Sequence, residues 1–186
     1  MNPFITTAIK QLEYYKSLAD KTFQQLTDEQ LFWQYNAESL SIAMIVQHLS
    51  GNMLSRWTDF LTTDGEKDWR NREAEFEAHL TSRTAVLIAW EKGWQCLFDA
   101  INPLTETELL QIIYIRNEGH TVLEAINRQL AHYPYHIGQI TYIGKMLLDA
   151  QWQSLSIPKG NSKAYNANKF TKEKTIKHFI DGMKEA

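Results

Sequence analysis

The sequence predicts an all-α fold, a bundle of four long helices with a short β element and an extended C-terminal tail. Apolar residues recur at helical spacing over four long stretches, and polar segments with turn residues separate these stretches. Only one short run has the β-branched and aromatic density that is typical of a strand. With 186 residues, 44% of them apolar, the chain is expected to form one domain, with the bundle in residues 1–151 and the tail in residues 152–186.

The first two long helices are expected in the N-terminal part of the chain. Asn2 is a capping residue followed by a proline, which predicts a helix start, and the apolar period continues to about Gln25. The segment "LTDEQLFW" predicts a turn with a short helix. A second long helix is expected from Ser41, with an apolar stripe that continues to Leu61. Residues 62–73 contain Asp-Gly and many charges, which predicts a long surface loop.

The other two long helices flank the β element. The third is expected from about Thr81 to Ile101, where a following proline stops it. The run "LLQIIYIRNEG" predicts one short strand or a hairpin. Thr121 and Glu124 match a capping box, in which the hydroxyl and the carboxylate each accept a hydrogen bond from a free backbone N–H, and the fourth helix is expected to run to about Gln151.

The tail combines positive charge with large apolar groups. Residues 159–186 carry seven lysines and three acids, so this part has a net charge of +4 and the rest of the chain −7. Residues 152–170 have no helical period and predict an extended loop, and residues 172–184 are expected to form a terminal helix. Because exposing so many apolar groups costs solubility, we expect residues 152–170 to pack on the bundle of their own subunit or of a partner, with a homodimer preferred. The alternative for the charge is a solvated surface.

Two histidines stand four residues apart in "RQLAHYPYHIGQI". On a helix, His132 and His136 lie on one face with Cβ atoms about 6 Å apart, so both imidazoles can reach one metal ion. A catalytic site of the zinc type needs a third protein ligand, and among the six histidines we select His48, at the rim of the apolar stripe of the second helix. The alternative is that these are hydrogen-bonded structural histidines. Pro134 removes one backbone N–H between the pair, which predicts either a bulge that adjusts the ligand angle or a mild bend.

The segments "IVQHLSGNMLSRW" and "LAHYPYHIGQI" resemble the DinB-like superfamily, with "HxxxHxGQ" as the most specific motif. The resemblance covers about residues 4–168. It implies an up-down-down-up four-helix bundle and a divalent metal site formed by His48, His132 and His136. Relatives in this superfamily include thiol S-transferases and a thiol-dependent isomerase, and one small branch, which the sequence resembles most, has no assigned function.

Three neutral imidazoles would leave the metal with its full charge and open positions, so that it lowers the pKa of a bound water or thiol. Zinc and nickel are the preferred metals, and no acidic residue next to the ligands forms an "HExxH" base. We therefore expect a metal-dependent enzyme that transfers a low-molecular-weight thiol, of the bacillithiol or glutathione kind, to an electrophilic small molecule. The alternatives are a non-catalytic, stress-related metal-binding domain that dimerises and a metal-dependent hydrolase.

A group of polar residues is expected to line the mouth of the site. Asn52 and Arg56 follow His48 at intervals of one helical turn, and Arg70 and Arg72 lie in the loop after this helix. Arginines bind carboxylates through paired hydrogen bonds, which would suit an anionic thiol. The alternative is a solvated loop with internal ion pairs. Gln139, one turn after His136, is a candidate for substrate contact or for contact with a metal ligand.

Charge and composition also limit the function classes. A net charge of −3 gives no reason to expect nucleic-acid binding. No apolar run approaches the roughly 20 residues that cross a bilayer, and the N-terminal residues show no signal-peptide pattern. The single cysteine, Cys96, excludes an intramolecular disulfide, so we expect a cytoplasmic protein.

Overall fold

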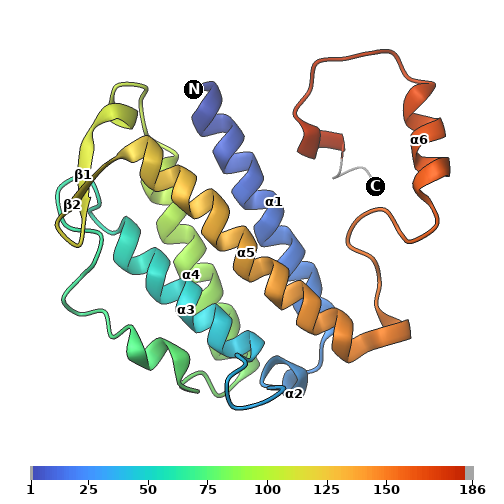
Figure 1. Cartoon of the computed structure of the whole chain (residues 1–186), viewed down its shortest axis with the longest axis horizontal. Coiled ribbons are helices and arrows are strands. Elements are labelled where there is room, and N and C mark those ends of the chain that lie inside the picture. The colour runs from blue at the N-terminus through green and yellow to red at the C-terminus, as the bar shows by residue number, and fades with distance from the viewer. Residues whose placement is uncertain (1, 183–186) are drawn as a thin grey trace.

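The computed structural model describes residues 2–182, and this part of the chain is mostly helical, with six α-helices and one two-stranded sheet (Figure 1). The four long helices are α1 (Pro3–Gln25), α3 (Ile42–Trp57), α4 (Arg83–Ile101) and α5 (Val122–Leu148). α3 packs along α4 and α1 along α5, and α3 also contacts α5 while α1 contacts α4. Each long helix therefore packs on two others. None of the helices in residues 2–182 is long and apolar enough to cross a membrane.

The core between the long helices is rich in aromatic side chains. Trp90 and Trp94 of α4 are buried. Trp90 packs edge-on against Phe23 of α1, with the ring centroids 5.3 Å apart, and Trp94 packs against Tyr133 of α5 at 5.8 Å. These ring contacts join α1, α4 and α5, and they set the position of α5 along the axis of α4.

Three of the four predicted starts of the long helices are confirmed. Asn2 caps α1, Ser41 caps α3, and the Thr121–Glu124 capping box opens α5. The short helix α2 (Asp28–Leu31) lies in the predicted turn. α3 ends at Trp57, before the expected Leu61.

The early end of α3 has a backbone cause. Asp59 adopts a positive φ of 48°, which an α-helix does not allow. α4 begins at Arg83 rather than at about Thr81, because Ser82 is its N-cap and accepts a hydrogen bond from the N–H of Ala85.

The predicted β element is a hairpin, β1 (Ile112–Ile115) and β2 (Glu118–Thr121), paired antiparallel. Arg116 and Asn117 at the turn both have positive φ, as a two-residue hairpin of type I′ requires. The carboxylate of Asp64 accepts a hydrogen bond of 2.8 Å from each of their N–H groups. The hairpin is thereby tied to the loop after α3, and the two segments form one wall of the site described below.

The C-terminal segment differs from the prediction. Residues 162–170, expected to be extended, form α6 (Ser162–Phe170), whereas residues 172–178 are not helical and only the 3-10 turn η4 (Phe179–Gly182) follows. α6 has no buried residue, so it has no apolar face that a periodicity could reveal. η4 is held instead by tertiary contacts with α1: Ile180 is buried and Asp181 pairs with Lys10 at 3.0 Å. The last two residues of the expected helix, 183 and 184, lie outside the described part of the chain.

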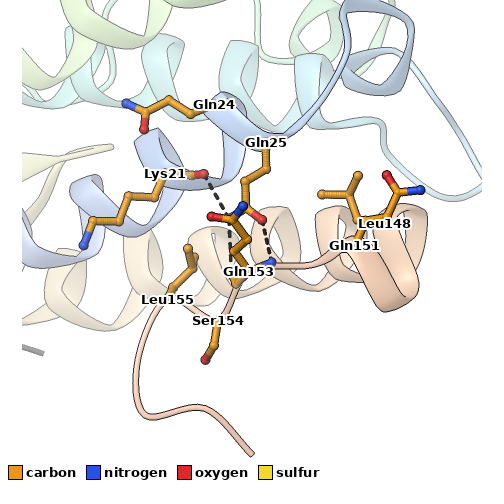
Figure 2. A pocket seen from close by; sticks show the side chains of 8 residues that line it. All are labelled: Lys21, Gln24, Gln25, Leu148, Gln151, Gln153, Ser154 and Leu155. Carbon is orange, nitrogen blue, oxygen red and sulfur yellow. Dashed lines mark hydrogen bonds between the residues drawn. The ribbon is translucent and has the colours of Figure 1, made fainter.

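The expected packing of residues 152–170 is only partly seen within one subunit. Gln153 is joined to Gln25 of α1 by two reciprocal hydrogen bonds (Figure 2). Trp152 and Leu155 are half-buried. Beyond this point the chain leaves the body, and Figure 1 shows α6 set apart from the long helices. Phe170 is 85% exposed. The chain's own body therefore covers the start of this segment and not its end.

Candidate metal centre

The three histidines selected from the sequence lie together. His48 comes from α3, and His132 and His136 come from α5, and their ligand nitrogens all lie within 4.8 Å of one another. The Nε2 atoms of His132 and His136 are 3.2 Å apart. The ring of His48 lies 5.6 and 5.0 Å from the other two ring centroids, and its other side stacks on Phe76.

Each histidine also has a fixed partner at Nδ1. The three contacts are His48 to Glu75 Oε2 at 2.9 Å, His132 to Gln129 Oε1 at 3.1 Å and His136 to Gln139 Oε1 at 2.7 Å. Carboxylate and amide oxygens only accept hydrogen bonds, so each Nδ1 carries the proton and each Nε2 has a free lone pair. Oxygen acceptors of this kind orient metal-binding histidines and make them better ligands.

The histidines are in the neutral state that binds a metal ion. Burial, together with the neighbouring His136 and His48, lowers the pKa of His132 to about 4, and burial also lowers the pKa of His136. Both rings are therefore neutral at pH 7, and their lone pairs point at each other across 3.2 Å. A divalent cation removes this repulsion, and neutral imidazole is its common nitrogen ligand. The residues present thus fit a three-histidine metal site.

The two histidines of α5 lie close together because the helix continues through Pro134. All residues of Val122–Leu148 are α-helical, Pro134 included, so no bulge forms at the proline, which leaves the alternative of a mild bend. The i,i+4 spacing then brings His132 and His136 onto one face. The two glutamines stand three residues outside the histidines, in the pattern Q-x-x-H-x-x-x-H-x-x-Q, and each lies one turn from the ring that it holds.

The partner of His48 belongs to a buried ion pair. Glu75 lies in the 3-10 turn η1 (Glu73–Phe76), which packs on α3. Its carboxylate accepts two hydrogen bonds from Arg70, Nε to Oε1 at 2.7 Å and Nη2 to Oε2 at 2.9 Å. Burial by itself raises the pKa of Glu75, but the hydrogen bonds from His48 and Arg70 lower it below its usual value. Glu75 is thus held as an anion behind His48.

Glu75 can approach α3 only because residue 51 is glycine. A Cβ atom at Gly51 would overlap the carboxylate of Glu75 at Oε1. The absence of a side chain one turn along α3 therefore lets the loop place its carboxylate against His48.

A cavity of about 400 Å³ opens over the histidines. Four of the five predicted substrate-contact residues line it: Asn52, Arg56, Arg70 and Arg72. The fifth, Gln139, is not among its lining residues and instead holds His136. The prediction of internal ion pairs in the loop is also correct for Arg70, whose side chain is 3% exposed and pairs with Glu75 and Glu66.

Sequence reasoning missed several residues of this site. Gln129 could have been found from the sequence, because it lies three residues before His132 just as Gln139 lies three residues after His136. Glu75 could not have been found, since 27 residues separate it from His48 in a stretch that is charged throughout. Arg116 and Arg128 also line the cavity, and only the packing of the hairpin and of α5 around it brings them there.

A second cavity, of about 490 Å³, lies between the end of α1 and residues 148–155 (Figure 2). Its side chains are mainly glutamines, and Lys21 is the one titratable group among its lining residues. Although this cavity is larger, it holds no group of side chains that can bind a metal or act as an acid–base pair. The histidine cavity is therefore the candidate functional site.

Comparison with known proteins gives a family and no closer relative. No match was found among curated proteins or among solved structures. The family model described as "Protein of unknown function (DUF1572)" matches residues 1–161, which is most of the chain. The protein therefore belongs to the DUF1572 family.

Proposed function

We propose that the protein is a divalent-metal-dependent enzyme that transfers a low-molecular-weight thiol to an electrophilic small molecule. The observation that carries the proposal is the set of three Nε2 lone pairs that converge beneath an open cavity, each fixed by an oxygen acceptor at Nδ1. We also propose that the four long helices form the up-down-down-up bundle of the DinB-like superfamily, whose metal site has the same ligand spacing.

The histidines and their partners would hold the cation, with zinc and nickel as the preferred ions. A divalent cation held by these residues would lower the pKa of a bound thiol towards neutral pH. Glu75, Gln129 and Gln139 keep the three imidazoles in the tautomer that binds metal.

The carboxylate that contacts the histidines is not placed as the base of a hydrolase. A hydrolase of the metalloprotease kind needs a carboxylate base that reaches a water molecule. Both oxygens of Glu75 already accept hydrogen bonds from Arg70 and His48, so this carboxylate orients a ligand and is not available as a base. A thiol that is deprotonated at the metal needs no further strong base. The open cavity likewise supports an enzyme over a non-catalytic metal-binding domain.

The test starts from metal content. The purified full-length chain should contain close to one divalent ion per chain, and the His132→Ala variant should contain almost none. The metal-loaded chain is then screened for conjugation of bacillithiol, glutathione, cysteine and coenzyme A to a fluorogenic bimane electrophile. A rate above the uncatalysed one, lost in His132→Ala, is expected for at least one thiol. A metal-loaded chain without activity towards any thiol would favour the non-catalytic alternative.

We further propose that the protein is a homodimer. Large apolar side chains are exposed on one face of α5, at Tyr135, Tyr142 and Met146, and in the C-terminal segment, at Phe170 and Ile176. A second copy is the partner that would cover both surfaces at once. Light scattering should give twice the chain mass for the full-length protein, and deletion of residues 152–186 should halve this mass or cause aggregation. An unchanged mass and stability after the deletion would contradict the dimer formed through this segment.

A further inference from the structure

Arg56 is a buried charged residue without a hydrogen-bond or ion-pair partner among residues 2–182. It lies on α3, two turns after His48, and is 4% exposed. Its Nε and Nη1 atoms are inaccessible and form no hydrogen bond, and no ion pair of Arg56 occurs among residues 2–182. A buried guanidinium normally has acceptors for its N–H groups, because leaving a charged donor without one is costly. Arg56, with its unsatisfied N–H groups, lines the histidine cavity.

The surroundings of Arg56 make room for it and supply another donor. Gly65 lies against the guanidinium, and a Cβ atom there would be 3.0 Å from Nη1. Asn52, between His48 and Arg56 on the same face of α3, accepts a hydrogen bond from the Tyr133 hydroxyl at Oδ1. Because this oxygen is occupied, the group that Asn52 can offer to the cavity is its NH₂ donor.

The charged residues that line the cavity indicate which class of ligand it would bind. Five arginines and a single acidic residue, Glu118, line the cavity, although the chain as a whole has a net charge of −3. Arg70 and Arg116 have carboxylate partners, Glu75 and Glu66. The cavity is therefore a positive region on an acidic protein, which attracts and concentrates anions.

We propose that Arg56 is the receptor for a carboxylate or phosphate group of the molecule that binds in the histidine cavity, with the Asn52 amide as a second donor. A guanidinium binds both groups through paired hydrogen bonds. Eight residues of helix separate His48 from Arg56, which corresponds to about 12 Å along the axis. The ligand is then an elongated organic anion, with its reactive group at the histidines and its anionic group at Arg56.

This inference gives the chemical class of the ligand and rests on the proposed function only in requiring that the cavity binds a small molecule. It needs no thiol chemistry. Its test therefore uses binding as the readout, so that it can hold or fail separately from thiol transfer.

The test measures the melting temperature of the full-length, metal-loaded chain at constant ionic strength with inorganic phosphate, succinate or the neutral succinamide. At a concentration ten times the Kd, phosphate or succinate should raise the melting temperature by roughly 3 to 6 °C. Succinamide should have no effect. Lys145→Met, which removes an exposed cation of α5 that does not line this cavity, is the control and should keep the response.

Arg56→Met should abolish the response and, in anion-free buffer, should melt at a higher temperature than the wild type, because the unpaired buried charge is gone. If this variant does not fold, Arg56→Lys should bind the two anions at least tenfold more weakly, because lysine cannot form the paired hydrogen bonds. An undiminished response in either variant, or no response of the wild type to either anion, would overturn the inference. A lower melting temperature of Arg56→Met in anion-free buffer would also contradict it, since Arg56 would then have a structural role.

Discussion

The two ends of the cavity differ in how their buried polar groups are satisfied. At the histidine end, each imidazole Nδ1 has an oxygen acceptor, and Glu75 is held by both hydrogen bonds of Arg70. At the other end Arg56, which is 4% exposed, has no partner in the described part of the chain. In this cavity Arg70 positions Glu75, whereas we propose that the unsatisfied Arg56 is placed for a ligand. The same residue type therefore has two roles in one cavity.

The largest loss of stability is expected from removing the ion pair between Arg70 and Glu75 at the histidine end of the cavity. Arg70→Met leaves Glu75 as a buried carboxylate without its main partner, which should lower the free energy of unfolding by about 3–5 kcal/mol. Urea denaturation measures the change. Arg72→Met is the control, because Arg72 is exposed and has no ion pair among the described residues, and should stay within about 0.5 kcal/mol of the wild type. Equal losses in the two variants would mean that the Arg70–Glu75 pair has no special role.

Removing the metal is expected to have the next largest effect. A cation that binds only the folded chain stabilises it by about 2.7 kcal/mol at one hundred times its Kd, or roughly 5 to 10 °C in melting temperature. A chelator should remove this increment from the wild type and leave His132→Ala nearly unchanged. The same chelator shift in both proteins would place the metal at another site.

A smaller effect is expected from displacing Glu75 without changing any polar group. In Gly51→Ala the new Cβ takes the space of the Glu75 carboxylate, so His48 loses its orienting acceptor. We expect metal affinity to fall about 10- to 100-fold, measured by competition with a metal indicator. Gly138→Ala is the matched control. Its Cβ meets no atom within 4 Å, so affinity should not change and stability should rise by about 0.5–1 kcal/mol. A loss of affinity in both variants would contradict the role given to Glu75.

The last prediction concerns pH in the metal-free protein. The pKa of His132 is about 4 in the folded chain and about 6.5 in the unfolded one, so between these values the unfolded chain binds more protons. Stability should therefore be full above pH 6.5 and fall as the pH falls towards 4. Urea unfolding of the metal-free wild type across this window should show the decline, and His132→Ala should show a shallower one. Stability that increases on acidification through this window would contradict the buried, neutral state of His132.

Much of the fold and the pairing of two of the three histidines follow from local sequence. Helix starts depend on the few residues around a cap, and Asn2, Ser41 and Thr121 were sufficient to predict them. The spacing of His132 and His136 places both on one helical face wherever the helix is packed. The hairpin follows from one run of β-branched residues and its turn. In each case the interaction joins residues that are close in the chain.

Tertiary structure decided the features that depend on distant parts of the chain. Glu75 and Arg70 look like surface charges in a loop, and only the packing of that loop on α3 buries them behind His48. Arg56 becomes an unpaired charge because the loop, the hairpin and α5 close over it without providing an acceptor. η4 is held by contacts with α1 rather than by a helical period of its own. A local pattern determines which face of a helix a residue occupies, but burial and pairing depend on what packs against that face.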